Sequence, residues 1–489
     1  MSEQSERREI VRADDATIDA TDEVIATIAE YAVTHQQPSD EAMATAHLSM
    51  LDALGCGLLA LRFPACAQLL GPTVHGTVTP HGARVPGCSY VLDPVTAAFD
   101  IGAMNRWLDY NDTWLAAEWG HPSDSLGGIL ALADYLSRAA VAEGRTPLLM
   151  RDVLVAMVKA HEIQGVLSLE NSFNRAGMDH TLLVRVATAA VATDLLGGSR
   201  DDAVAAVSNA WVDGGPLRVY RHAPNAGARK SWAAGDATSR GVRLALMALA
   251  GERGYASALT APGWGFEDAL FRSQRITLPQ RLGSYVMENV LFKARYPAEF
   301  HAQTAVECGV ELHPRVIGRL DEIERIEITT QESAIRIISK TGPLRNPADR
   351  DHCLQYMTAV ALLKGDLVAD DYTDSAARDP RIDALRERMT VTEDPEYSRE
   401  YLDPGARSIA NAVQVFFHDC TATPRVEVRF PIGHRRRRDD VRPYLLAKFA
   451  ANIATRLPER RCERLLALWH DPEALAALPA NQFLDVLAL

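Results

Sequence analysis

The sequence of 489 residues is poor in the features that mark secreted and membrane-spanning proteins. Its seven cysteines are odd in number, lie far apart and include no C-x-x-C pair, so we expect neither a disulfide framework nor an iron–sulfur cluster. No run of about 18 apolar residues suggests a membrane span. The first residues, MSEQSERR, lack the apolar segment of a signal peptide. These absences predict a cytoplasmic protein with no membrane partner.

Basic residues are also fewer than acidic ones. The chain has 51 Lys and Arg against 64 Asp and Glu, which gives a net charge of −13. A protein this acidic does not attract nucleic acid through its overall charge, so no nucleic-acid partner is expected. An anionic substrate would need a local basic pocket. Apolar residues make up 47% and charged residues 24% of the chain, as in ordinary globular proteins, and the length favours two domains.

The spacing of apolar residues predicts helices for about the first 270 residues, with many alanines that allow close packing. A charged arm is expected at 1–20 and loops or short strands at 62–92. The expected helices are residues 23–35, 41–61, 94–107, 123–142, 149–169, 180–196, 200–211 and 231–250. This part of the chain is therefore predicted to be all helical.

The pattern changes near residue 276. Alternating apolar and polar residues predict strands at 322–330, 412–417 and 425–430, and residues 276–292 are also strand-like. Helices are expected at 297–312, 352–363 and from about 440 to the end. The predicted fold is mostly α with a second α+β domain. Its parts are a large helical domain at 1–275, a smaller α+β domain at 276–434 and C-terminal helices at 435–489 that return to the helical domain.

A polar stretch at residues 109–124 (DYNDTWLAAEWGHPSD) separates two apolar helices. Asp93 and Pro94 are a typical N-cap and first residue for the helix before it. Ser123 is the expected N-cap of the helix after it, with Asp124 in the first turn. The polar residues thus fall at the end of one helix, in a loop and at the positive start of another. Such a place can bind a carboxylate and move protons, so we expect the active-site centre here.

Asp109, Asp112 and His121 are the ionisable groups of most interest in this stretch. The aspartates could be a cap or a surface acidic pair, but three nearby tryptophans favour burial. His121 could be a structural histidine, yet a helix start and an aspartate beside it make it a candidate acid or base. Two aspartates and a histidine could also bind a metal. No second acidic cluster has ligand spacing, so no metal is expected.

A second stretch at residues 218–231 (RVYRHAPNAGARKS) carries four fixed cations and a histidine just before a helix. It suits carboxylates or phosphates, although a solvated basic loop is the alternative. It is not a P-loop, because the Gly-Lys-Ser/Thr sequence and the preceding strand are missing.

Three further segments hold polar residues of interest. Lys293 is expected where a strand meets a helix, and residues 351–356 (DHCLQY) open an otherwise apolar helix. Each is a weak signal alone, and Tyr356 could be a core tyrosine with a satisfied hydroxyl. The basic run at 434–438 (HRRRR) is interpreted as a solvated hinge or interface segment.

Four motifs, in this order along the chain, resemble the MmgE/PrpD family. They are residues 108–114 (LDYNDTW), 119–124 (WGHPSD), 223–236 (APNAGARKSWAAGD) and 431–438 (PIGHRRRR). The resemblance covers nearly the whole chain, and the context of residues 110–111 and 118–120 is similar to the bacterial, iron–sulfur-independent dehydratase branch. It implies a large helical domain, a smaller α+β lid, an active site between them and a homodimer.

The resemblance also implies which residues form the site. The catalytic residues it assigns are Asp109, Thr113, His121, His180 and Tyr356. It also assigns Lys230 and Lys293, which we expect to bind the substrate. From the basic stretch and the helix start, rather than from the resemblance, we expect Arg221, Arg229 and Ser123 to bind it too. No cofactor is implied.

The implied reaction is the dehydration of 2-methylcitrate to 2-methyl-cis-aconitate in the methylcitrate cycle of propionate catabolism, with citrate or cis-aconitate as further substrates. Such a reaction removes a weakly acidic C–H proton and expels a poor leaving group, so a base and an acid must act together. Asp109 or His121 would be the base, and the other, or Tyr356, the acid. The alternatives are cis-aconitate decarboxylation or another family reaction on a tricarboxylate. A tricarboxylate-binding protein without activity is disfavoured, because it needs no acid or base groups.

Overall fold

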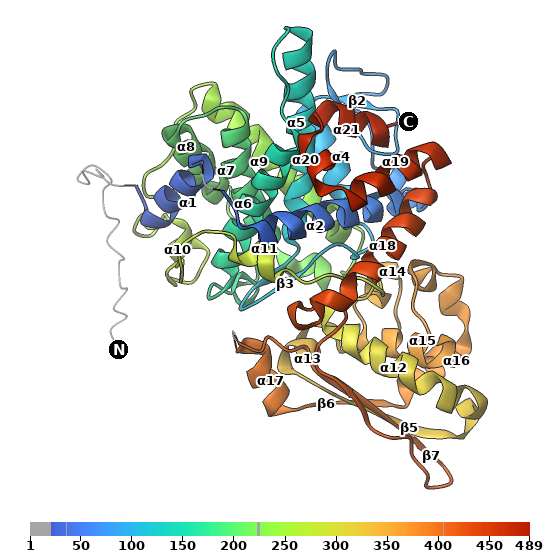
Figure 1. The fold of residues 1–489 in the computed structure, drawn as a ribbon. Coiled ribbons are helices and arrows are strands. Elements are labelled where there is room, and N and C mark those ends of the chain that lie inside the picture. Colours follow the sequence, from blue (N-terminus) through green and yellow to red (C-terminus); the bar gives the residue numbers. More distant parts are fainter. Residues whose placement is uncertain (1–20, 36, 223–224, 404) are drawn as a thin grey trace, which may run out of the picture.

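The computed structural model describes residues 21–35, 37–222, 225–403 and 405–489. The charged arm expected at 1–20 lies outside the described residues. The chain forms a large helical body and a smaller α+β lid below it (Figure 1). One hydrophobic core fills the body, and a second, separate core lies under the lid sheet. The predicted fold class, mostly α with a smaller α+β part, is confirmed.

Long helices build the body, and they pack closely where glycines face each other. Helices α4 and α9 cross at Gly102 and Gly235, where a Cβ atom on Gly235 would lie 2.4 Å from the Phe99 carbonyl oxygen. Only glycine permits this approach. The body helices are α1 (Glu23–Val33), α2 (Asp40–Ala60), α3 (Pro64–Ala67), α4 (Pro94–Arg106), α5 (Leu126–Ala142), α6 (Met150–Ser168), α7 (Thr181–Leu195), α8 (Arg200–Val212), α9 (Arg229–Leu249), α10 (Phe266–Ala269) and α11 (Tyr285–Asn289).

Two short hairpins interrupt these helices. Strands β1 (Ala83–Arg84) and β2 (Val91–Leu92) pair antiparallel, as do β3 (Trp114–Leu115) and β4 (Trp119–Gly120). Helix α2 has the length and hydropathy of a membrane span, and it is the one such helix in the described part of the chain. In this structure 89% of its most apolar window is buried among other helices, as in many protein core helices.

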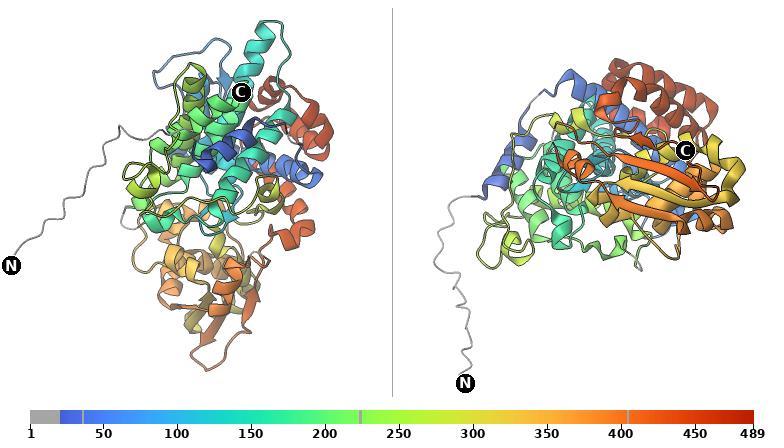
Figure 2. Two further views of the ribbon diagram at one scale, coloured as in Figure 1. Left: turned by 90° about the vertical axis from the view of Figure 1, so that its left-hand side faces the viewer. Right: turned by 90° about the horizontal axis from the view of Figure 1, so that it is seen from below.

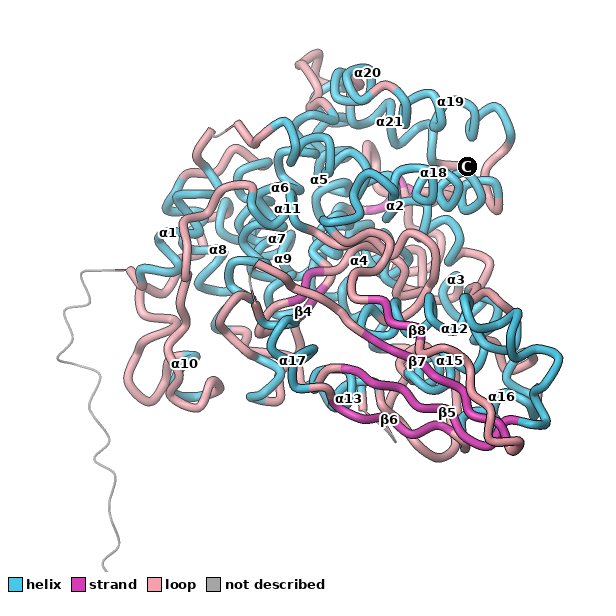
Figure 3. Tube along the Cα trace, turned by 60° about the horizontal axis from the view of Figure 1, so that its bottom comes forward, coloured by secondary structure: helices cyan, strands magenta, loops and turns pink. Residues whose placement is uncertain are grey.

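The lid is a four-stranded sheet with helices on one face (Figure 3). Strand order is β6-β5-β7-β8, with β5 and β6 parallel and the other pairs antiparallel. Helices α12 and α15 cover the apolar face of the sheet. The lid elements are α12 (Gln303–Val316), β5 (Ile323–Thr330), α13 (Glu332–Ile338), α14 (Pro347–Arg350), α15 (Leu354–Lys364), α16 (Pro380–Glu387), β6 (Met389–Glu393), α17 (Pro395–Leu402), β7 (Asn411–Phe417) and β8 (Val426–Val428).

After the lid the chain returns to the body (Figure 2). Helix α18 (Arg438–Ala454) packs on α2, and it is followed by α19 (Glu459–His470), α20 (Pro472–Ala477) and α21 (Ala480–Leu487). Near the C-terminus, the Leu489 N–H donates to the Cys88 carbonyl at 3.0 Å. The last segment of the chain thus completes the core built by the first.

Two local expectations were wrong, and one strand was missed. Residues 276–292 form no strand but a loop and helix α11, because Val286 and Met287 pack into the body and backbone pairing with other segments is found at its last two residues, Leu291 and Phe292. The helix expected from Ser123 begins at Leu126, after a 3-10 turn at Pro122–Ser125. The edge strand β6 was not predicted, since most of its residues are exposed and lack the apolar alternation.

Candidate active site

The polar stretch begins where α4 ends. Asp93 caps α4 by accepting hydrogen bonds from the N–H groups of Val95 and Thr96, and Pro94 takes the first helical position. The helix ends at Arg106, and the chain then turns at Asp109, whose φ of +52° is in the left-handed region. A non-glycine residue in this conformation is strained and marks a place where the surrounding contacts fix the backbone.

Asp109 is the hub of a buried charge cluster. Its carboxylate contacts the Arg106 guanidinium, lies 3.1 Å from the Lys293 ammonium and 3.3 Å from Nε2 of His121. Burial would raise the pKa of Asp109, but the two cations outweigh it and hold that pKa well below its ordinary value. Asp109 is therefore ionised and a weak base. Its charge orients the groups around it.

His121 is held with one ring nitrogen free to act. Its Nδ1 lies 2.6 Å from the Asp112 carbonyl oxygen, which can only accept, so Nδ1 carries the proton and Nε2 presents its lone pair. The Thr113 hydroxyl oxygen is 3.4 Å from the same Nδ1. Burial and the cations Arg106 and Lys293 lower the pKa of His121 well below its usual value. The imidazole is thus neutral, as a general base must be.

His180 lies beside His121, with 5.9 Å between ring centroids. Its two ring nitrogens are buried and make no hydrogen bond to the residues that the structure describes. Burial lowers the pKa of His180 well below its usual value. Gly120 permits the close approach, because a Cβ atom there would lie 3.2 Å from Cδ2 of His180. His180 is therefore a neutral side chain with unused polar atoms next to the charge cluster.

Lys230 reaches from the body to the lid. It stands in the first turn of α9, is 1% exposed, and contacts the carboxylate of Asp351 and, at 2.9 Å, Nδ1 of His352. Burial lowers the pKa of Lys230 to about 8 against the opposing pull of Asp351. The same surroundings lower the pKa of His352 to about 4, mainly through burial. The weak signal at residues 351–356 thus marks the lid's contribution to the charge cluster.

A cleft of about 340 Å³ opens beside this lid–body contact. Its walls include Trp107 and Ser231 from the body and Asp351 and Tyr372 from the lid. Because Asp351 lines the cleft and also contacts Lys230, the cleft reaches the edge of the buried cluster. It is the natural route for a small molecule to the site.

Asp112 serves as structural support on the far side of His121. Its carboxylate accepts hydrogen bonds from Ser49 at 2.9 Å, from Nε2 of His161 at 2.8 Å and from the Ser123 N–H at 3.1 Å. Ser123 therefore does not cap the following helix, and its backbone N–H is not free for a substrate anion. The Ser123 hydroxyl oxygen accepts from the Asn111 side chain at 2.8 Å. A role of Ser123 in binding the substrate therefore stays a prediction that rests on its hydroxyl group.

The structure places three other predicted residues outside the cluster. Arg221 is buried, but it is neutralised by Asp179, with 3.0 Å between Nη2 and Oδ1. The Arg229 side chain is 41% exposed and its guanidinium lies over the Trp232 ring, 4.4 Å from the centroid. The Tyr356 hydroxyl donates to the Asp371 carbonyl at 2.7 Å. The Tyr356 hydroxyl thus has its hydrogen-bond partner within the lid, and a catalytic role for Tyr356 stays a prediction.

Lys448 on α18 was missed by sequence reasoning. Its buried ammonium donates to the carbonyls of Tyr110 at 2.7 Å and Lys293 at 2.8 Å, and it pairs with Asp52 at 2.8 Å. One cation therefore links the two backbone segments that carry Asp109 and Lys293. Tyr110 lies 338 residues from Lys448, so no local pattern could have revealed the contact.

His301 was missed as well. Its ring nitrogens lie 2.8 Å from a Glu299 oxygen and 3.0 Å from the Tyr401 hydroxyl oxygen, and its ring stands edge-on to Trp119. The side chain is 0% exposed. A buried histidine with a carboxylate partner beside the β3–β4 hairpin extends the polar centre toward the lid. Within residues 21–35, 37–222, 225–403 and 405–489, no group of three or more His, Cys, Asp or Glu is arranged to hold a metal ion.

Comparison with known proteins agrees with this architecture. Residues 26–279 match the MmgE/PrpD N-terminal domain and residues 296–471 match the MmgE/PrpD C-terminal domain. The chain belongs to the MmgE/PrpD family. The resemblance read from the four sequence motifs is thereby confirmed.

Several enzymes of this family are similar over almost their whole length. The chain is 57% identical to 2-methylcitrate dehydratase of Escherichia coli (strain K12) over 471 residues, which cover 96% of this chain and 98% of the enzyme. It is 57% identical to the enzyme of that name from Cupriavidus necator, covering 96% and 97%. The mitochondrial 2-methylcitrate dehydratase of Yarrowia lipolytica is 54% identical, covering 91% and 87%.

Proposed function

We propose that the chain is a hydro-lyase that eliminates water from 2-methylcitrate to give 2-methyl-cis-aconitate. The observation that carries this proposal is the 57% identity to bacterial enzymes of that activity across 96% of the chain. The buried centre supports it chemically, since it combines a neutral histidine with several cations. As the implied pathway, we propose the methylcitrate cycle of propionate catabolism, and we propose citrate and cis-aconitate as further substrates.

The cations of the centre are suited to a tricarboxylate. Arg106, Lys293 and Lys230 are buried, and in the free enzyme two carboxylates, Asp109 and Asp351, balance them. A substrate carboxylate can replace Asp351 at the Lys230 ammonium, because the cleft opens at that contact. The negative charge brought by the substrate raises the pKa of the neighbouring histidine, which makes it a stronger base in the complex.

His121 is the base in this proposal. Its Nε2 takes the proton from the carbon next to a substrate carboxylate, the C–H electron pair forms the C=C bond, and the C–O bond breaks. The resulting imidazolium has the Asp109 carboxylate 3.3 Å away as its counter-ion. Lys293 and Arg106 stabilise the negative charge that builds up on the substrate carboxylate during proton removal. Thr113 completes the pocket beside the His121 ring.

Lys230 is the proposed acid. A pKa of about 8 leaves it protonated at neutral pH and makes it a better donor than an ordinary lysine. Its proton goes to the leaving hydroxyl, which departs as water. His180, with unused ring nitrogens, can contact the same hydroxyl or a carboxylate. This assignment gives Asp109 a positioning role and leaves Tyr356 in the lid core.

We propose a division of the chain into a helical domain at 1–275, an α+β lid at 276–434 and returning helices at 435–489. The two separate hydrophobic cores support a body and a lid, but Met287 and Phe292 lie in the body core and the lid core begins at Tyr296. A homodimer and a cytoplasmic location are proposed from the family resemblance and from the reduced state of all seven cysteines.

The test is incubation of the purified chain with 2-methylcitrate and with citrate, following the ultraviolet absorbance of the new alkene. Absorbance should rise with 2-methylcitrate and no carbon dioxide should form. Release of carbon dioxide from cis-aconitate would instead indicate a decarboxylase. Tight citrate binding with no turnover of either substrate would contradict an enzymatic role.

A further inference from the structure

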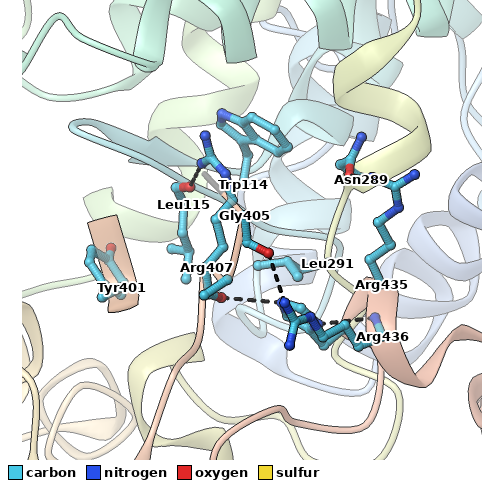
Figure 4. A pocket seen from close by; sticks show the side chains of 11 residues that line it. Trp114, Leu115, Asn289, Leu291, Tyr401, Gly405, Arg407, Arg435 and Arg436 are labelled. Carbon is cyan, nitrogen blue, oxygen red and sulfur yellow. Dashed lines mark hydrogen bonds between the residues drawn. The ribbon is translucent and has the colours of Figure 1, made fainter. Parts of the chain in front are cut away.

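A basic surface pocket lies at the junction of lid, body and C-terminal helices, outside the buried centre (Figure 4). Its enclosed volume is about 70 Å³, with an opening to solvent, and none of its lining residues is Asp or Glu. Three arginines line it. Arg407 comes from the segment between α17 and β7, and Arg435 and Arg436 come from the turn before α18. The basic run interpreted from sequence as a solvated hinge therefore forms part of a concave site.

In the described part of the chain, no carboxylate neutralises the charges of these arginines. The neighbouring Arg437 has a carboxylate partner, Glu307, at 2.9 Å. Among the described residues, no Asp or Glu oxygen forms such a pair with Arg407, Arg435 or Arg436. Three uncompensated guanidinium groups around one pocket are unusual in a chain with a net charge of −13. They create a local positive potential that favours an anion with more than one charge.

The arginines are held in place before any ligand arrives. Arg407 donates to the Leu115 carbonyl at 2.7 Å, Arg435 to the Asn289 side chain at 2.6 Å and Arg436 to the Gly405 carbonyl at 2.8 Å. Each bond uses one N–H of a guanidinium that has five, so donors remain for a ligand. Figure 4 shows these side chains around the pocket beside Trp114.

His434 joins the two arginine-bearing loops. Its Nε2 donates to the Arg407 carbonyl at 3.2 Å, and its Nδ1 accepts from the Arg436 N–H at 3.1 Å. The ring is therefore neutral and fixes the distance between the loops without adding charge. Preorganised donors lose little conformational entropy when an anion binds.

Backbone contacts link the pocket to the proposed active site. Leu291, in the pocket wall, exchanges backbone hydrogen bonds of 2.8 and 2.9 Å with Thr113. Phe292, which precedes Lys293, donates to the Gly433 carbonyl at 3.2 Å. Gly433 has a φ of +102°, and a Cβ atom there would lie 2.0 Å from the Phe292 carbonyl oxygen, so only glycine allows this docking.

We propose that this pocket is a second ligand site that binds a small multivalent anion, either a polycarboxylate or a phosphate compound. The three arginines supply the charge and the paired N–H donors that carboxylate and phosphate groups need. The bound anion joins lid, body and returning helices. This proposal is independent of the reaction at the buried centre.

The test is calorimetric titration of the full-length chain with inorganic pyrophosphate and, separately, with tricarballylate. The Arg435→Gln/Arg436→Gln variant should bind the preferred probe about 10-fold more weakly for each arginine removed. The matched control is Arg460→Gln/Arg464→Gln, which removes the same charge from exposed positions on α19. It should bind like the unmodified chain. Tighter binding of pyrophosphate identifies a phosphate ligand, and tighter binding of tricarballylate identifies a polycarboxylate.

Two results would overturn the proposal. One is that neither probe shows saturable binding up to about 10 mM. A single binding event that Arg435→Gln/Arg436→Gln retains unchanged counts as the same negative result, because that event does not depend on the pocket arginines. The other is an equal loss of affinity in the control, which would indicate a general charge effect. Circular dichroism checks that each variant is folded. If Arg435→Gln/Arg436→Gln is not folded, Arg435→Lys/Arg436→Lys keeps the charge, loses the bidentate contact and should still weaken binding about 10-fold.

Discussion

The buried Lys230 ammonium should limit activity at alkaline pH. Burial lowers the pKa of Lys230 from 10.5 to about 8, which disfavours the charged form by about 3 kcal/mol. A lysine with this pKa keeps its proton in about nine of ten molecules at pH 7 and in about one of ten at pH 9. Because the protonated form binds the substrate and donates the proton, kcat/KM should fall about tenfold per pH unit above pH 8.

Two variants test whether Lys230 causes the fall of kcat/KM above pH 8, which is the alkaline limb of the pH profile. Lys230→Arg keeps a positive charge at all accessible pH values, so the limb should disappear. Its kcat should also fall by about 10²–10⁴, because arginine cannot supply the proton to the leaving hydroxyl. Asp351→Asn removes the carboxylate that raises the pKa of Lys230, so the limb should move to lower pH. The matched control is Lys364→Arg, a half-exposed lysine that pairs with Asp371 in the lid.

The assay is the initial rate of alkene absorbance from 2-methylcitrate between pH 6 and pH 10, with the control variant measured in parallel. An unchanged alkaline limb in Lys230→Arg would refute the assignment of this titration to Lys230. A limb that moves upward in Asp351→Asn would refute the electrostatic reasoning. A normal kcat with a raised KM in Lys230→Arg would show that Lys230 binds the substrate without donating the proton.

Further predictions concern the rest of the site. His121→Ala should lower kcat by a factor of about 10²–10⁴ with the thermal midpoint of unfolding unchanged. Near wild-type turnover would contradict the role of His121 as the base. Lys448→Met leaves Asp52 as an unpaired buried carboxylate, so the free energy of unfolding in urea should fall by about 3–5 kcal/mol. Lys448→Arg should recover most of the lost free energy of unfolding. Equal urea midpoints for the unmodified chain, Lys448→Met and Lys448→Arg would contradict the pairing of Lys448 with Asp52. Gly120→Ala places a methyl group 3.2 Å from the His180 ring. It should lower kcat while leaving the free energy of unfolding nearly unchanged, which turnover and urea unfolding of the same preparation will check. Exhaustive chelation should leave the initial rate unchanged, and rescue of a lost rate by one divalent ion would point to a metal.

Local sequence signals located the central stretch because its chemistry is local. The Asp93 and Pro94 pair marks the start of α4, and the apolar periodicity marks its length. Arg106 and Asp109 are three residues apart, and His121 follows in the next hairpin. The sequence motifs also identified the family, which the comparisons confirm. The sequence did not predict two features correctly. Ser123 does not cap the following helix, because its N–H donates to Asp112. Residues 276–292 form no strand, because their apolar side chains pack into the helical body.

The sequence by itself determined the fold class and the family, and it predicted part of the polar centre. It did not reveal Arg106, His301 or Lys448. The tertiary structure decided which residues of the centre face one another and what charge each carries. Lys230 meets Asp351 across 121 positions of the chain, and Lys448 meets Tyr110 across 338. Helical periodicity and capping reach only a few residues along the chain, whereas burial and ion pairing depend on every element packed around a group. For that reason only the packed structure made Asp109 a weak base, His121 a neutral one and Lys230 a lysine that titrates near pH 8.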